Sequence, residues 1–253
     1  MSSMDKNKLN EFINVNISDF HKNRLASLNK LKLTDVLKRK NIYLYKAKNI
    51  QTSEELIKAV TDAYLSSQEE TIFGEFLEKL AVFTAQETKG GFKSGIEGID
   101  LEIIEDENKI RYIVSIKSGP HWGNSSQIKK MTDYFAKAKK ILKTQNSSSL
   151  PQIIAVNGCC YGKDNQQYKS NGDYYKLCGQ AFWEFISGEE NFYLSIIEPL
   201  GYKVKEKNED FAKDYAKVIN KFCREFLNEY FSEDGSIDWI KIVKLNSENK
   251  LKF

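Results

Sequence analysis

The sequence predicts an α/β fold in which a mixed central β-sheet is flanked by helices, with extra N- and C-terminal helices. Three observations support this prediction. Residues 99–105 and 110–117 are rich in Ile, Leu, Val and Tyr and flank a turn-like polar cluster, which indicates a hairpin. An apolar run at 152–158 indicates a further strand. Amphipathic helices are predicted around these strands, because apolar residues recur at three- and four-residue spacing.

The predicted hairpin brings an acidic and a basic side chain to one face. If Glu107 and Asn108 form the tip of a two-residue loop, Asp100 lies opposite Ser115. Lys117 then lies diagonally from Asp100 on the same face, because side chains alternate with a period of two. Diagonal neighbours are about 7–8 Å apart at the backbone, so both side chains can reach one phosphate group. This pairing suits metal-dependent hydrolysis of a phosphodiester.

The spacing of Asp100 and Lys117 resembles the active-site motif of the PD-(D/E)xK nuclease superfamily. In that motif an Asp opens one strand, and an acidic residue and a Lys, two apart, end the next. This chain departs from the motif at two positions, with Ile99 in place of Pro and Ser115 in place of the acidic residue. The resemblance implies a PD-(D/E)xK core in which the backbone carbonyl of Ile116 is a metal ligand.

Flanking segments carry a more specific resemblance. They are Glu70–Glu78, the Lys-Ser-Gly-x-x-Trp block at 117–122, residues 157–163 and the Gly-x-x-Phe-Trp-x-x-Ile block at 179–186. In this order and spacing they resemble the type II restriction endonucleases whose best-known member cuts the palindrome RGGNCCY, a family that also has Ser at the position of Ser115. The resemblance covers about residues 45–240. It implies Mg²⁺-dependent, sequence-specific cleavage of double-stranded DNA at a short palindrome. The cognate DNA methyltransferase would belong to the same system without being a physical partner.

The expected chemistry gives each catalytic candidate a role. Asp100 is expected to bind Mg²⁺, which prefers oxygen ligands and keeps several waters. Lys117 is expected to hold the attacking water and to offset charge on the phosphate. Ser115 can hold a metal-bound water but lacks the charge of a carboxylate. That charge is expected from the preceding helix, from Glu78 in preference to Glu75, although either can be an ordinary solvated residue.

The segment after Lys117 is expected to approach DNA. It lies between the predicted catalytic strand and the N-terminus of a basic helix, where backbone amides bind phosphate. Asn and Gln side chains can read base edges, whereas Trp122 can also be a buried packing aromatic. A polar loop after the strand at 152–158 is a second candidate. The candidate DNA-binding residues are His121, Trp122, Asn124, Ser125, Gln127, Lys129, Lys130 and Lys163.

The net charge of +3 does not by itself indicate a nucleic-acid partner, but the distribution of charge favours one. Residues 21–48 contain nine Lys and Arg residues against one acid, and residues 125–144 contain six Lys residues against one acid. Either run can be a solvated helix face. Next to a nuclease site, both favour contact with the phosphate backbone.

Three segments are expected along the chain: a mostly helical basic region at 1–66, the catalytic core at 67–205 and a helical extension at 206–253 that is a candidate for dimerisation. A homodimer is expected, because a palindrome presents two equivalent strands to be cut. Further elements are predicted as helices at 53–66, 68–86, 125–144, 179–187 and 208–231 and as a strand at 192–197.

Several classes of protein are excluded by absent patterns. No apolar run approaches the ~18 residues of a membrane span, and no signal peptide is recognisable, so a cytoplasmic protein is expected. The four cysteines form no CxxC pair and there are only two histidines, which argues against structural zinc and for free thiols. There is no phosphate-binding loop for ATP, no Gly-x-Ser-x-Gly elbow and no dinucleotide fingerprint.

Two other classes remain open at this level. A structure-selective or repair nuclease, or a DNA-binding module, could use the same fold. A helical interaction protein with a basic surface is a further alternative, but it leaves the spacing of Asp100 and Lys117 unexplained.

Overall fold

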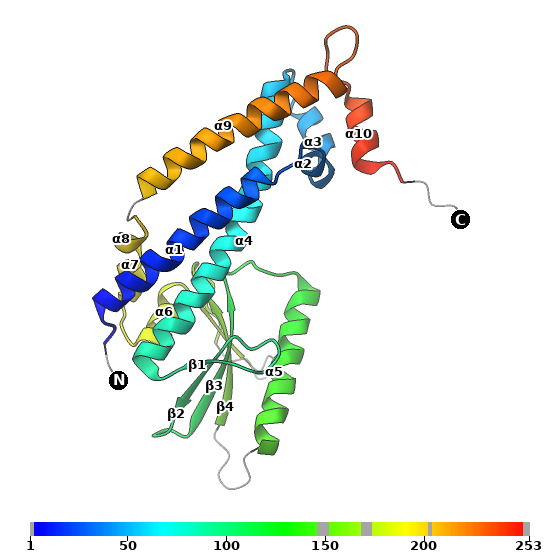
Figure 1. Ribbon diagram of the computed structural model, residues 1–253. Coiled ribbons are helices and arrows are strands. Elements are labelled where there is room, and N and C mark those ends of the chain that lie inside the picture. The colour runs from blue at the N-terminus through cyan, green and yellow to red at the C-terminus, as the bar shows by residue number, and fades with distance from the viewer. Residues whose placement is uncertain (1–2, 146–151, 168–173, 202–203, 250–253) are drawn as a thin grey trace. The chain divides into compact units, whose positions relative to one another are not determined.

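A mixed five-stranded sheet lies at the centre of the catalytic part of the chain (Figure 1). The structure is a computed structural model that describes residues 3–145, 152–167, 174–201 and 204–249. Neighbouring strands pair in sequence order, antiparallel from β1 to β3 and parallel from β3 to β5. The strands are β1 (Phe92–Lys93), β2 (Leu101–Glu105), β3 (Ile110–Lys117), β4 (Gln152–Cys159) and β5 (Tyr174–Cys178). The predicted mixed sheet with flanking helices is therefore confirmed.

The hairpin has the register expected from its sequence. Leu101 pairs with Val114, and Glu105 pairs with Ile110. The loop contains four residues, 106–109, rather than the two that were expected, and the Lys109 N–H closes it by donating to the Asp106 carbonyl at 3.2 Å. Lys109 has a positive φ of 50°, as is common at the end of such loops. The longer loop leaves the pairing unchanged, because it is centred on the same two residues.

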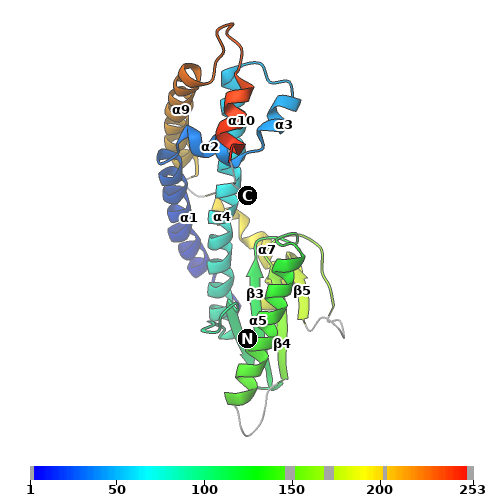
Figure 2. The ribbon, with the colours of Figure 1, turned by 90° about the vertical axis from the view of Figure 1, so that its right-hand side faces the viewer.

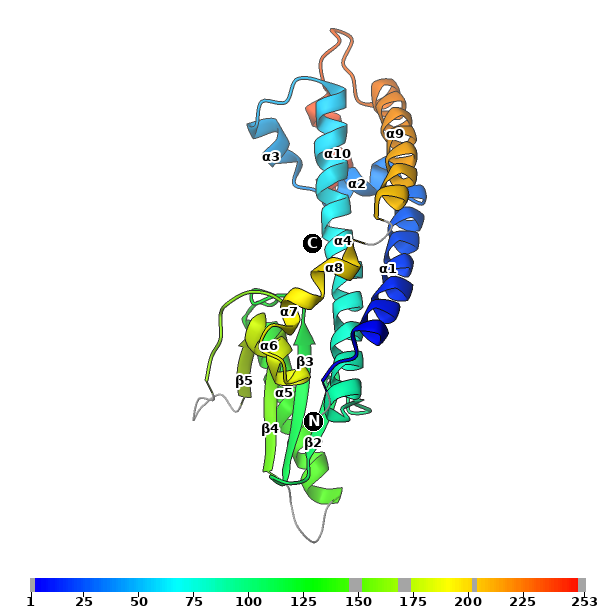
Figure 3. The same cartoon turned by 90° about the vertical axis from the view of Figure 1, so that its left-hand side faces the viewer.

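Helices cover the two faces of the sheet. On one face, α5 (Ser125–Gln145) buries Met131, Phe135, Ala138 and Leu142 against residues such as Ile113 and Ala155. Ile128, which lies three residues before Met131 on the same helix, is exposed. On the other face lies α6 (Gln180–Ser187), where the rings of Tyr112 and Phe185 meet edge to face at 5.1 Å. Figure 3 shows α6 beside β5.

Two expectations about individual elements are wrong, and one strand was missed. Residues 192–197 form no strand but two short helices, α7 (Phe192–Ser195) and α8 (Ile197–Leu200). Their buried residues are Phe192, Ile196 and Pro199, a helical spacing. The helices expected at 53–66 and 68–86 are one 37-residue helix, α4 (Ser53–Lys89), because none of residues 66–68 is a helix breaker. Strand β5 was not expected.

The chain divides into two compact units, each discontinuous in sequence. Residues 1–17 and 74–202 form the first, which contains the sheet, and residues 18–73 and 203–253 form the second, which is helical. These boundaries differ from divisions at 66/67 and 205/206, because α1 (Lys6–Asn29) and α4 each contribute to both units. A dimerisation role for residues 206–253 stays a prediction.

The helical unit has its own apolar core. Figure 2 shows α10 (Trp239–Ser247) beside α2 (Leu33–Arg39) and α3 (Ile42–Ala47). The long helix predicted at 208–231 is α9 (Val204–Glu229), which buries Phe222 and Phe226 in this core. No helix in the described part of the chain has the length and apolar content that a membrane crossing requires. All four cysteines are free thiols, as expected.

We predict that Gly158→Ala destabilises the first unit. A Cβ atom at Gly158 would lie 2.1 Å from Cε2 of Phe182, a fully buried ring on α6. Overpacking of this kind costs about 1–3 kcal/mol, which thermal unfolding will detect as a lower melting temperature. Gly95→Ala is the control, since nothing lies within 4 Å of its Cβ position. Equal melting temperatures for the two variants would contradict this packing.

Candidate active site

The catalytic candidates meet at the open end of the hairpin. The last β2–β3 pair is Leu101 with Val114, and the Asp100 N–H donates to the Val114 carbonyl at 2.9 Å. Strand β3 continues for three residues beyond this pair. There the N–H of Ile116 donates to Oδ2 of Asp100 at 2.6 Å. The Asp100 carboxylate thus takes the place of the backbone carbonyl that a longer β2 strand would offer to the Ile116 N–H. This hydrogen bond fixes the position of the carboxylate against β3.

The side chains of Ser115 and Lys117 reach the same carboxylate. Lys117 Nζ lies 3.9 Å from Asp100 Oδ2, and the Ser115 hydroxyl donates to that oxygen at 3.5 Å. Both residues project from one face of β3, because side chains alternate along a strand. The Lys117 and Asp100 side chains remain 28% and 24% exposed, so a substrate can reach both.

The backbone of Ile116 also faces this group. In an antiparallel sheet the N–H and C=O of one residue point to the same side of the strand. Since the Ile116 N–H points to Asp100, the Ile116 carbonyl lies on that side as well. The Ile116 side chain is buried, 4% exposed, in the core behind the strand.

Glu78 of α4 joins the group from a neighbouring helix. Burial of its carboxyl and the nearby charge of Asp100 raise the pKa of Glu78 above its usual value. One turn earlier on α4, the Cβ position of Gly74 lies 3.0 Å from the Ser118 hydroxyl, so the helix passes close to the end of β3. Glu75, the other candidate on this helix, is exposed.

Lys93 is a second cation near the site that sequence reasoning missed. It lies on β1 and pairs with Leu101, the neighbour of Asp100. The charges of Lys93 and Lys117 both lower the pKa of Glu78, although burial and Asp100 outweigh them. Strand β1 has only two residues, so its sequence carries no periodic signal that could have revealed it.

The ligand set fits a hard divalent cation. Asp100, Glu78 and the Ile116 carbonyl offer oxygen atoms only, and a cation would offset the charge of Asp100 that disfavours ionisation of Glu78. Within the described ranges no group of three or more His, Cys, Asp or Glu side chains could hold a metal ion. Mg²⁺ prefers oxygen ligands and retains several waters, so these three groups could hold it.

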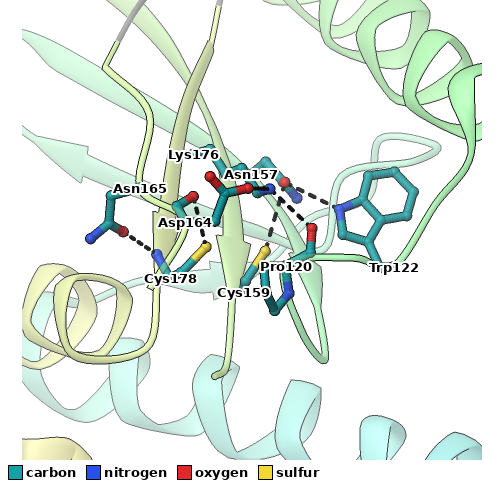
Figure 4. Close-up of polar contacts among 8 residues, drawn as sticks. All are labelled: Pro120, Trp122, Asn157, Cys159, Asp164, Asn165, Lys176 and Cys178. Carbon is teal, nitrogen blue, oxygen red and sulfur yellow. Dashed lines mark hydrogen bonds and ion pairs between the residues drawn. The ribbon is translucent and has the colours of Figure 1, made fainter. Parts of the chain in front are cut away.

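Trp122 connects the segment after β3 to the next strand. Its indole Nε1 donates to Oδ1 of Asn157 on β4 at 3.3 Å (Figure 4). The Asn157 side chain also donates to the Ser115 carbonyl at 3.4 Å. Lys117 Nζ lies 5.2 Å from the centre of the Trp122 ring, within the range of a cation–π contact. The ring also packs against the apolar cluster under α5, so Trp122 has a structural role here. Asn157 was missed because its strand was interpreted only as apolar core.

Asn124 and Gln127, which were candidate base-reading residues, bond to each other's backbone at the start of α5. The Asn124 side chain accepts from the Gln127 N–H at 3.1 Å, and the Gln127 side chain accepts from the Asn124 N–H at 3.0 Å. This reciprocal pair is a capping box. Ser125 is the first residue of α5 and is exposed.

The remaining DNA-binding candidates are exposed and stay predictions. His121 lies between Pro120 and Trp122, and Lys163 lies in the loop after β4. Lys129 and Lys130 lie in the first turns of α5, and Lys130 Nζ is 5.6 Å from the centre of the Tyr134 ring.

The comparison with protein families identifies the family of the chain. The family model of the type II restriction endonuclease EcoO109I matches residues 7–208, which include every catalytic candidate. No curated protein matches the chain significantly. A match over most of the chain shows the family. The chain therefore belongs to the EcoO109I family of type II restriction endonucleases and is a site-specific deoxyribonuclease.

Proposed function

We propose that this enzyme cuts both strands of a short palindrome in double-stranded DNA and requires Mg²⁺ bound by Asp100, Glu78 and the Ile116 carbonyl. The observation that carries the proposal is the group of two carboxylates beside Lys117 at the open end of the hairpin. Mg²⁺ in this position supplies Lewis-acid stabilisation of the negative charge that develops on the phosphate.

The protein's own groups have separate tasks in this proposal. Asp100 is oriented by the Ile116 N–H, so its second oxygen is left to bind the cation. The Lys117 ammonium orients the attacking water and offsets charge on the scissile phosphate. Ser115 is 2% exposed and bonds weakly to Asp100, which supports a role in orienting that carboxylate.

DNA contact is proposed for the segment that follows Lys117 and for the loop after β4. His121, Lys129, Lys130 and Lys163 carry exposed groups suited to the phosphate backbone. Asn124 and Gln127 already cap α5, so their proposed contribution is to present the helix amides to a phosphate together with Ser125. Trp122 is proposed to support the segment after Lys117 through its contacts with Asn157 and with the apolar cluster of α5.

The active-site assignment predicts a graded loss of cleavage in three variants. Asp100→Asn keeps the shape but removes the charge for Mg²⁺, so cleavage falls by about 100-fold or more. Lys117→Ala lowers cleavage by a similar factor. Ser115→Ala lowers cleavage much less than either of the other two changes. Cleavage in Mg²⁺ and band-shift affinity in Ca²⁺ measure the two effects separately.

Binding is expected to survive in these variants. Asp100→Asn binds DNA as tightly as wild type or more tightly, since it removes a charge that repels phosphate. Lys117→Ala weakens binding slightly, because one phosphate contact among many is lost. Near-wild-type cleavage by Asp100→Asn would place the active site elsewhere.

A second prediction distinguishes the roles of Glu78 and Glu75, the two candidate carboxylates on α4. Glu78→Gln lowers cleavage by about 10-fold or more and raises the Mg²⁺ concentration needed for half-maximal rate, because a metal ligand is lost. Glu75→Gln, the matched control three residues earlier, leaves both quantities near wild type. Magnesium titration of the cleavage rate provides the measurement. A larger effect at Glu75 than at Glu78 would reverse the assignment.

We also propose that the enzyme is a homodimer that associates through the helical unit. Among the described residues of this unit, four large apolar side chains are exposed: Tyr43, Leu44, Leu227 and Ile240. Tyr43 and Leu44 lie on α3 and Ile240 lies on the adjacent α10. Exposed apolar side chains on neighbouring elements support an interface between copies, and a two-fold dimer matches the symmetry of a palindrome.

This proposal predicts a dimer that a single charge disrupts. Ile240 is 72% exposed, so Ile240→Glu leaves the fold intact but shifts the protein toward monomer in light scattering at micromolar concentration. Val15→Glu is the control, since Val15 is 61% exposed on α1 in the other unit. A wild-type monomer with and without DNA would reject the dimer, and a fully dimeric Ile240→Glu would reject this surface.

A further inference from the structure

Lys176 on β5 is a buried cation that joins two loops. The residue is 9% exposed, and its Nζ lies 2.5 Å from Oδ2 of Asp164 and 2.9 Å from the carbonyl oxygen of Pro120. Figure 4 shows the ammonium between these two partners. Pro120 belongs to the segment that follows catalytic strand β3, and Asp164 belongs to the loop that follows β4. One side chain thus bonds to both candidate DNA-binding segments.

The two segments also pack closely along their backbones. The Cys160 N–H donates to the Lys117 carbonyl at 2.9 Å, and the Tyr161 N–H donates to the Ser118 carbonyl at 3.1 Å. A Cβ atom at Gly162 would lie 2.6 Å from the Pro120 ring, so only glycine allows this approach. These contacts bring the segments together but end before residue 164.

Two residues further along the loop after β4, Asn165 and Gln166, are hydrogen-bonded to β5. Gln166 and Lys176 exchange both backbone hydrogen bonds, at 2.9 and 3.0 Å. The Asn165 side chain accepts from the Cys178 N–H at 2.6 Å. The Lys176 side chain extends this attachment to the segment after β3 through Pro120. It therefore links the ends of three adjacent strands.

The environment keeps Lys176 charged. Burial alone would lower its pKa, but the hydrogen bond and charge of Asp164 outweigh burial and raise it. Lys176 in turn lowers the pKa of Asp164, and His121 adds a smaller effect in the same direction. The Asp164 carboxylate is 44% exposed, so the ion pair contributes little to net stability, because solvent screens the attraction. Its hydrogen-bond geometry nevertheless selects one arrangement of the groups that it joins.

We propose that Lys176 is a positioning residue for DNA recognition, which fixes the segment after β3 and the loop after β4 as one rigid DNA-contacting surface. The proposal rests on the function proposed above. Pro120 is three residues from Lys117, so a shift of this segment also moves the scissile phosphate relative to the catalytic group. Misplacement by about 1 Å can lower a rate by about 100-fold while substrate binding changes little.

The test compares the wild type with Lys176→Met, Asp164→Asn and the double variant. Methionine fills the same space without the charge, and Asp164 is partly exposed, so it tolerates the loss of its partner. The recognition sequence is first mapped from wild-type cuts. Steady-state kcat and KM are then measured on that site and on sites with one base pair changed, alongside melting temperature.

Thr88→Val is the matched control. Thr88 is 4% exposed, and its hydroxyl donates to the carbonyl oxygens of Thr84 and Ile186 away from the two loops. Its loss lowers the melting temperature but leaves the discrimination between sites unchanged. We expect Lys176→Met to reduce the discrimination between sites with little change in melting temperature. Replacing a buried ion by an apolar side chain need not destabilise the fold.

We expect Lys176→Met to lower kcat on the mapped site by about 10-fold or more with little change in KM. Its preference for that site over single-base variants falls by about 10-fold. The double variant is no worse than Lys176→Met, since both changes break one contact. The proposal would be overturned if Lys176→Met kept the wild-type kcat and the wild-type discrimination between sites. It would also be overturned if Thr88→Val, with its lower melting temperature, lost kcat and discrimination to the same extent as Lys176→Met. A wild type that does not cut DNA would instead reject the proposed function.

Discussion

The bond from the Ile116 N–H to the Asp100 carboxylate is the contact on which the site depends. Strand β3 extends beyond its antiparallel partner, and this leaves backbone groups at its end that need another acceptor. A carboxylate supplies it, and hydrogen bonds to charged groups contribute about 1.5–3 kcal/mol. The same bond orients Asp100 next to Lys117 and beside the Ile116 carbonyl. Oδ2 of Asp100 therefore both accepts the hydrogen bond from the end of β3 and lies next to the Lys117 ammonium.

The balance of charge around this bond is the physical basis for the proposed cation. Burial and the charge of Asp100 raise the pKa of Glu78, and the charges of Lys93 and Lys117 only partly offset them. In this chain Ser115 stands on β3 where the motif usually has an acidic residue. Under the proposed function, Glu78 of α4 supplies the second carboxylate in its place.

The sequence predicted the hairpin register and the grouping of Asp100 with Lys117 because both follow from period-two alternation over short distances. It also predicted α5 and β4, whose apolar patterns are regular. The failures lie where the pattern is short or ambiguous. Residues 192–197 have an apolar content that suits either a strand or a helix, and only packing against α6 decides between them.

Contacts between distant segments could not be predicted from the sequence. The approach of Lys93 depends on a two-residue strand, and the role of Lys176 depends on the pairing of β5 beside β4. Asn124 and Gln127 illustrate a different difficulty. Their spacing is that of a capping box, yet their side chains are also of the type that reads bases. The sequence alone does not distinguish these two uses.

The most direct test of the account is the position of a bound cation. Crystals soaked with Mn²⁺, which accepts the same oxygen ligands as Mg²⁺, can be measured by anomalous diffraction. We expect a peak within coordination distance of Asp100, Glu78 and the Ile116 carbonyl, and we expect Asp100→Asn to abolish it. A peak bound by other residues, or one that persists unchanged in Asp100→Asn, would contradict it.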